Sequence, residues 1–344
     1  MTEGTVVHDG RTPLHIAAWK GSLKVADYLC RKLPADQIDR RDNNGQTPLA
    51  TAARWHHDHT QRPQDPNTPE ASKERCRGEI DKYKRIIHSL LRAGADISSI
   101  FTATERSRRQ RQPVLTEHAA VLNELPTAVM SAVNAALRPQ REMADALTEA
   151  LHNATAQQLK TAFPSFDPSR PSVPPPPLPP HVDPEPSWQD DYMPFANQDM
   201  SAIAWRVASS FVNPSVLEQS PRPVQNVTEV GRRVNTAMAR FVEAAASLHV
   251  VGNKEVVGGT TNVGGQVVRA PQLECFVVGG VGGRKMELRE VVQRAILDEA
   301  AKWGLVGQID NGFRKDVSAV EWGAVGWVDK GRDGRETFRP LRMA

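Results

Sequence analysis

The chain has 344 residues, of which 39% are hydrophobic and 24% are charged, and its formal net charge is +3. This length allows two or three domains. A charge so small and evenly mixed gives no reason to expect nucleic acid or a membrane surface as partner. Three isolated cysteines without a Cys-x-x-Cys pair argue against a disulfide framework and against a cysteine-built zinc site.

The sequence carries no sign of export or of membrane insertion. Its first residues lack a basic segment followed by an apolar run, and nowhere do about 18 apolar residues follow one another. We therefore expect a protein of the reducing cytoplasm, with the nucleus as the alternative.

One phrase occurs twice near the start of the chain. Gly10 to Ala18 has the sequence Gly-Arg-Thr-Pro-Leu-His-Ile-Ala-Ala, and Gly45 to Ala53 has Gly-Gln-Thr-Pro-Leu-Ala-Thr-Ala-Ala. Thr12 and Thr47 are placed to cap the helix that follows, with a proline at the first helical position, where its missing N–H costs nothing. After Gly21, an apolar stripe predicts a second, antiparallel helix.

Together with Leu90–Ile97 (Leu-Leu-Arg-Ala-Gly-Ala-Asp-Ile), these phrases resemble the ankyrin repeat. The two threonines are 35 positions apart, close to the repeat's period of about 33 residues. The resemblance covers residues 5–100 and implies stacked pairs of helices that bind other proteins. It also implies that His15 is a structural hydrogen-bonding residue and has no catalytic role.

The second copy departs from the repeat pattern. About 26 extra residues separate its two helices, and this polar, proline-bearing insert at 56–80 predicts a surface loop, with Ser72–Leu91 extending the outer helix. Only two copies are clear, whereas such stacks usually need at least three units. We predict that a helical cap at 116–163, broken at Pro126 and Pro139, covers the open end. A separate helical hairpin is the alternative.

In the family that the repeats resemble, turn tips and inner helices contact the partner. Trp19-Lys20 and Arg54-Trp55 each place an aromatic residue beside a cation, and Trp and Arg are enriched at interface hot spots. The alternative for each tryptophan is packing against the adjoining helix. The predicted partner-binding residues are Arg11, Trp19, Lys20, Gln46, Arg54 and Trp55.

Two clusters of polar residues suggest other sites. The run His56-His57-Asp58-His59 offers metal ligands, but a flexible loop does not fix ligands in a geometry, so we expect no metal. The basic run Arg106–Arg111 has no interleaved aromatic residue, which favours a solvated linker. A nuclear-import or nucleic-acid patch is the alternative.

Residues 164–198 predict a disordered linker, because 11 of the 26 prolines lie between Pro164 and Pro186. Its centre favours a polyproline II helix, which is either a stiff spacer or a docking peptide for a WW- or SH3-type domain. The following stretch, Trp188–Phe195, mixes acidic and aromatic residues, a composition suited to folding on a partner. The predicted docking residues are Pro174, Pro175, Pro176, Pro177, Leu178, Pro179 and Pro180.

Residues 199–344 predict an α+β domain that resembles no family we recognise. The form of Asn226–Glu229 is that of a capping box before a helix, and short apolar runs between glycines predict hairpins. A further helix is expected over Met286–Trp303, closed by Gly304.

A glycine run, residues 279–283, invites comparison with phosphate-binding loops. A strand, a glycine loop and a helix N-terminus together can cradle phosphate. However, Met286 follows Arg284-Lys285 where a Walker loop needs Ser or Thr. A flexible turn is therefore the favoured interpretation.

The sequence thus predicts a multidomain protein with an all-α ankyrin-like repeat stack and helical cap, a disordered proline-rich linker and a C-terminal α+β domain. Its expected function is that of a non-enzymatic scaffold or adaptor, without a cofactor, that binds protein partners through the repeats and the proline-rich segment. The alternative is an enzyme or nucleotide-binding protein whose site lies in the glycine-rich C-terminal domain and which the repeats target.

Overall fold

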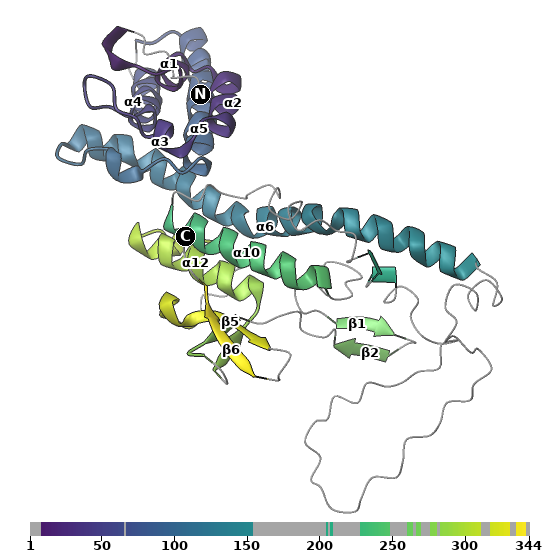
Figure 1. Cartoon of the computed structure of the whole chain (residues 1–344). Coiled ribbons are helices and arrows are strands. Elements are labelled where there is room, and N and C mark those ends of the chain that lie inside the picture. Colours follow the sequence, from purple (N-terminus) through teal and green to yellow (C-terminus); the bar gives the residue numbers. More distant parts are fainter. Residues whose placement is uncertain are drawn as a thin grey trace, which may run out of the picture.

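A computed structural model gives the structure of the chain. It describes residues 8–64, 67–153, 204–205, 207–208, 228–247, 260–263, 266–269, 276–280, 283–310, 317–330 and 335–341. An N-terminal group of helices and a C-terminal group of helices with a small antiparallel sheet are joined by one long helix, α6, which runs past both (Figure 1). The proline-rich stretch 164–198 lies outside the described residues.

The first copy of the repeated phrase forms α1 (Pro13–Lys20) and α2 (Leu23–Lys32). As predicted, Thr12 caps α1, because its hydroxyl accepts a hydrogen bond from the backbone N–H of His15. Gly21, at a φ of 66°, ends α1 in the left-handed conformation, which glycine adopts without a Cβ clash. Short helical turns flank the pair: η1 (His8–Gly10) and α3 (Ala35–Ile38).

The second copy forms α4 (Pro48–Gln61) and α5 (Glu70–Arg92), and the predicted cap, Thr47, accepts a hydrogen bond from the N–H of Ala50. The helices α1 and α4 pack together as an inner pair, and α2 and α5 as an outer pair. Two short turns complete this part of the chain: η2 (Arg62–Gln64) and η3 (Ile97–Ser99).

The predicted surface loop over 56–80 is wrong for His56–Gln61, which continue α4. The predicted extension of the outer helix over Ser72–Leu91 is confirmed, because α5 begins at Glu70. The two helices have 14 and 23 residues, against 8 and 10 in the first pair. His56 stands where the first copy has Gly21, so no glycine ends the inner helix there. The ring of His59 then stacks on Tyr83 of α5, at 5.5 Å between centroids, and this contact holds the two extensions together.

Helix α6 (Glu105–Asn153) is a continuous helix of 49 residues, about 74 Å long at 1.5 Å per residue. The predicted breaks at Pro126 and Pro139 are therefore wrong. The run Arg106–Arg111 is largely exposed to solvent, as predicted, but it forms the first turns of α6 and not a linker. An interior proline removes one backbone hydrogen bond. Here buried residues on both sides of Pro126, Leu125 and Val129 among them, keep the helix packed.

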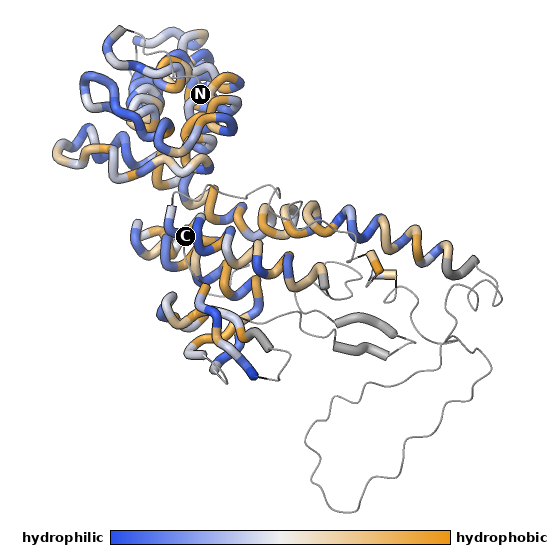
Figure 2. Tube along the Cα trace, viewed as in Figure 1, coloured by the Kyte–Doolittle hydropathy of each residue, from blue (hydrophilic) through white to orange (hydrophobic). Residues whose placement is uncertain are grey.

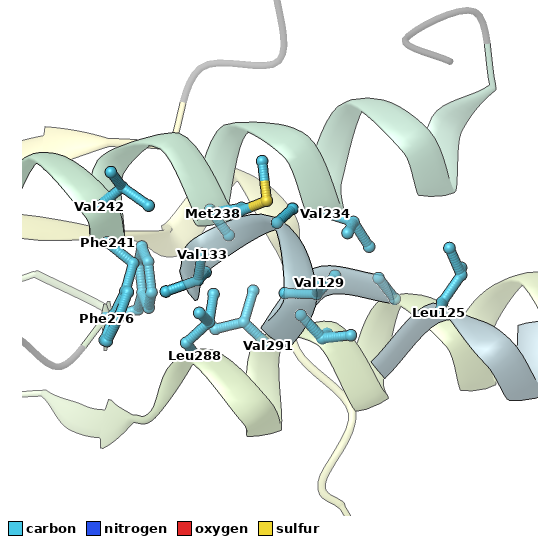
Figure 3. Packing of buried hydrophobic residues seen from close by; sticks show 14 of the residues in the cluster. Leu125, Val129, Val133, Val234, Met238, Phe241, Val242, Phe276, Leu288 and Val291 are labelled. Atoms are coloured by element: carbon cyan, nitrogen blue, oxygen red, sulfur yellow. The ribbon is translucent and has the colours of Figure 1, made fainter. Parts of the chain in front are cut away.

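The described residues form two hydrophobic cores, and α6 contributes to both. One lies between the repeat helices and includes Val114 and Val121 of α6. The other lies between α6, α10 (Glu229–Ser247), α12 (Leu288–Lys302) and the sheet, as Figure 3 shows in close-up. Hydrophobic stretches alternate with hydrophilic ones along all three of these helices (Figure 2).

The described strands are β1 (Thr260–Val263), β2 (Gln266–Arg269), β3 (Phe276–Val278), β4 (Arg284–Met286), β5 (Val325–Lys330) and β6 (Glu336–Pro340). The C-terminal sheet has the strand order β4-β3-β5-β6, and all neighbouring strands are antiparallel. The two predicted helices, α10 and α12, occur close to their expected places. The capping box predicted at Asn226–Glu229 would make Asn226 the cap of α10, whereas it is the hydroxyl of Thr228 that accepts from the N–H of Gly231, at 3.0 Å. Gly304 follows α12 with a φ of 70°. Strands β1 and β2 form a separate hairpin. Two short turns, η5 (Val306–Gln308) and η6 (Trp322–Ala324), lie between α12 and β5.

The continuity of α6 generates a stability prediction. We expect Pro126→Ala to stabilise the protein by about 1–3 kcal/mol, because alanine restores a backbone donor in the helix interior. Urea unfolding followed by circular dichroism measures this change. Pro34→Ala is the matched control, since Pro34 precedes α3 and lies outside any helix interior. A destabilised Pro126→Ala protein would contradict an unbroken α6.

Candidate functional site

The first repeat is joined to the second by a buried histidine, His15, in whose place the second repeat has Ala50. The Nδ1 atom of His15 accepts from the backbone N–H of Thr12 at 3.1 Å, and its Nε2 donates to the carbonyl oxygen of Gln46 at 2.9 Å. Burial lowers the pKa of His15, so the ring is neutral and has one donor and one acceptor. The imidazole therefore ties the first repeat to the turn before the second, and its predicted structural role is confirmed.

The turn that carries Gln46 is also held by side-chain hydrogen bonds. Asp42 accepts hydrogen bonds from the backbone N–H groups of Asn44 and Gln46, each at 2.9 Å. The hydroxyls of Thr47 and Ser99 are 3.0 Å apart. Because the backbone of Gln46 is held at both its N–H and its carbonyl, only its partly exposed side chain is left for contact with a partner.

Trp19 lies partly exposed at the end of α1, with two cations on its ring. The Nζ atom of Lys20 is 4.0 Å from the ring centroid, and the guanidinium carbon of Arg11 is 5.3 Å from it. Arg11 is itself oriented by Asp42, at 3.8 Å. The carbonyl of Trp19 accepts from the hydroxyl of Tyr83 at 2.9 Å. The structure thus brings three of the predicted residues together on a fixed backbone.

The second predicted pair is arranged differently. Trp55 packs against the repeat core, and its ring is tilted on His59 at 6.1 Å. Arg54 is 50% exposed and lies 3.9 Å from Asp58, which also pairs with Arg106 of α6 at 2.8 Å. The contact between Asp58 and α6 was not expected from the sequence, because it depends on how α6 crosses α4.

Comparison with known protein families bears on these helices directly. Residues 2–61 match the family model for ankyrin repeats (3 copies). The N-terminal part of this protein carries ankyrin repeats. The matched stretch ends at the last residue of α4, and α5 completes the second repeat in the structure. Searches of curated proteins and of solved structures found no match to the chain.

A groove of about 630 Å³ lies on the outer side of the ankyrin repeats, between α2, α5 and α6. Sequence reasoning missed it, because it forms only where α6 packs beside α5. Its charged residues are of both signs, and its lining consists of Leu23, Lys24, Asp27, Lys84, Arg85, His88, Ser89, Glu117 and Glu124.

One histidine of this groove is held between two carboxylates of α6. His88 Nδ1 is 3.5 Å from Glu117, which is only 7% exposed, and His88 Nε2 is 3.2 Å from Glu124. Lys84 also approaches Glu117, at 3.5 Å. The hydrogen bond to Glu117, together with Glu124, raises the pKa of His88 despite its burial. When it is protonated, the ring forms ion pairs that join the outer ankyrin helix to α6.

The histidines of the insert do not form a metal site. Burial lowers the pKa of both His56 and His59, and the ring of His59 is part of the packing between α4 and α5. Among the residues that the structure describes, no group of three or more His, Cys, Asp or Glu is placed to hold a metal ion. Within the same residues, no helix is long and apolar enough to cross a membrane.

The glycine run of the C-terminal region does not have the phosphate-loop arrangement. Strands β3 and β4 pair as an antiparallel hairpin, and Gly279 and Gly280, at φ values of 85° and 91°, follow β3 where its turn begins. A strand therefore separates the turn from α12. The guanidinium of Arg284 pairs with Glu290 of that helix. The phosphate-binding arrangement considered for this run, in which a glycine loop leads from a strand directly into a helix N-terminus, is therefore wrong.

The position of His88 predicts a pH-dependent stability. Because the pKa of His88 is higher in the folded protein than its ordinary value of 6.5, protonation of the ring stabilises the folded state. This stabilisation is fully present below pH 6.5 and is lost as the pH rises through the folded-state pKa. We expect His88→Gln to cost about 1 kcal/mol at about pH 5.5 and much less at about pH 9. Denaturant unfolding at both pH values measures the difference, with His57→Gln as control. An equal cost at both pH values would contradict this.

Proposed function

We propose that this protein is a non-enzymatic scaffold or adaptor that binds protein partners through the inner surface of its ankyrin repeats. Ankyrin repeats generally mediate protein–protein interaction, and this general role is the starting point. The observation that carries the proposal is Trp19, an aromatic side chain that stays partly exposed beside the charged groups of Arg11 and Lys20. Tryptophan and arginine are the residues most enriched at interface hot spots.

The surroundings of Trp19 favour binding because they are ordered in advance. Its backbone is held by Tyr83, and Arg11 is held by Asp42. A partner that covers the indole therefore pays less conformational entropy than it would for a freely moving side chain. We place Gln46 and Arg54 on the same surface, because they occupy the positions in the second repeat that Arg11 and Trp19 occupy in the first. Trp55 supports this surface through its packing on the core.

We further propose that the proline-rich segment 174–180 docks on a WW- or SH3-type domain, on the basis of its composition. Two weak sites on one chain raise the effective concentration of each partner near the other. We assign this work to the cytoplasm or the nucleus, where the thiols of Cys30 and Cys76, both free in the structure, would stay reduced.

The repeat surface is tested by removing the indole. We expect Trp19→Ala to weaken partner binding by about 30-fold or more, the effect of losing a hot-spot side chain worth about 2 kcal/mol. The measurement is a quantitative affinity capture from cell extract with the full chain, followed by titration of the purified partner. The fold should persist, because Trp19 is not a core residue.

The matched control for this test is Phe101→Ala, since Phe101 is 64% exposed and lies outside the inner helices. Partners that are lost with Trp19→Ala but retained with Phe101→Ala support the proposal. The same set of partners on all three proteins would exclude the inner surface as the binding site.

The proline-rich segment is tested separately. We expect the double substitution Pro176→Ala and Pro179→Ala to weaken binding to isolated WW or SH3 domains by about tenfold, because the groove recognises spaced prolines in a polyproline II helix. Fluorescence titration of the full chain against a panel of such domains measures this. Undiminished binding, or no binding by the unaltered chain, leaves the segment as a spacer.

A further inference from the structure

The two outer helices of the ankyrin repeats can be compared position by position. Leu29-Cys30-Arg31 of α2 and Leu90-Leu91-Arg92 of α5 occupy the same place in the repeat, 61 positions apart. Cys30 and Leu91 are buried to the same degree, at 5% and 4% exposure. The comparison therefore aligns residues that point in the same direction in the two units.

One side of α5 is covered by α2, and the equivalent side of α2 is open. Ile86 is fully buried, and Ser89 donates a hydrogen bond to Asp27 of α2 at 3.5 Å. The residues that correspond to them on α2 are Val25 and Tyr28, which are 50% and 57% exposed. This face of α2 thus presents apolar residues at the positions through which α5 receives α2.

The unpaired charges that α2 carries beside this face are positive. Lys24, Tyr28 and Lys32 are spaced by four residues and therefore form one stripe along the helix. Both lysines are exposed, and Lys24, at the edge of the face, also lines the groove between α2, α5 and α6. The sole acidic residue of α2 is Asp27, and it pairs with Arg31 at 2.7 Å. An end face of this kind is apolar at its centre and basic at its edges.

The charges decide between two kinds of occupant. A second copy of this chain, docked through the same face about a two-fold axis, would bring the lysines of both copies together. Like charges at an interface cost binding free energy, whereas opposite charges favour both association and specificity. An acidic helix with an apolar stripe satisfies the centre and the edges of the face at once.

We propose that the end face of α2, formed by Lys24, Val25, Tyr28 and Lys32, binds an acidic amphipathic helix of a partner protein in the position that a preceding repeat would take. The apolar residues of that helix pack on Val25 and Tyr28, and its carboxylates pair with the two lysines. Terminal units of repeat stacks usually end in a polar face, and this one does not. The proposal is independent of the Trp19 surface.

The test uses a synthetic helical peptide of about 18 residues, with Leu at positions i, i+3, i+4 and i+7 and Glu elsewhere. Its fluorescence anisotropy is titrated with the full chain, beside a matched peptide that has Lys in place of every Glu. We expect the chain to prefer the Glu peptide. The double variant Lys24→Glu, Lys32→Glu should bind the Glu peptide about tenfold more weakly and the Lys peptide more tightly, because complementary charge sets the preference.

Two controls separate the end face from general charge effects. Lys285→Glu with Arg289→Glu makes the same change in net charge on exposed residues of the C-terminal region, and it should leave the preference unchanged. Val25→Ser with Tyr28→Ser should abolish binding of the Glu peptide without loss of thermal stability, because both side chains are largely exposed.

Three outcomes overturn the proposal. The first is equal binding of both peptides, or of neither, by the unaltered chain. The second is self-association in sedimentation equilibrium that Val25→Ser with Tyr28→Ser removes, which assigns the face to a second copy. The third is binding of the Glu peptide only after deletion of residues 1–7, which assigns the face to the chain's own N-terminal segment.

Discussion

Val121 and Leu122 are neighbours in the sequence, yet Val121 lies in the core of the ankyrin repeats and Leu122 in the core formed with α10 and α12. Two faces of α6 are therefore buried at once. Each fully buried aliphatic side chain contributes about 1.5–3 kcal/mol, whereas each interior proline costs about 3 kcal/mol. With many such side chains and three prolines, packing outweighs the missing hydrogen bonds. The same burial covers the open end of a stack that has only two repeats.

The place where the two cores meet is held by polar contacts as well. Trp303 packs against both cores, and its indole N–H donates to Glu299 at 2.6 Å. Burial alone would raise the pKa of Glu299, but its hydrogen bonds with His118 and Trp303 lower it, so the carboxylate stays ionised. The guanidinium of Arg111 lies over the same indole, at 5.1 Å. Apolar and charge-assisted contacts thus fix the C-terminal region on the helix that caps the repeats.

What could be predicted from sequence follows the range of the interactions involved. The caps at Thr12 and Thr47 depend on three or four consecutive residues, and both were predicted correctly. The helical conformation of His56–Gln61 and the unbroken helix at Pro126 were not predicted, because contacts with residues distant in the sequence override local preference there. The same reason explains the unexpected groove between α2, α5 and α6, since no local pattern records where α6 crosses the repeats. The aromatic–cation pair at Trp19 was visible because its members are adjacent.

The double burial of α6 also limits how this protein can vary. Deleting one residue between Val121 and Val129 would turn everything beyond it by about 100° around the helix axis and shift it by about 1.5 Å. The side chains that now face α10 and α12 would then point elsewhere, although every one of them would still be present. Insertions and deletions should therefore be tolerated between α4 and α5, where the chain merely turns. They should not be tolerated along α6, because the number of residues in this helix sets the rotation of the C-terminal core about the helix axis relative to the ankyrin repeats.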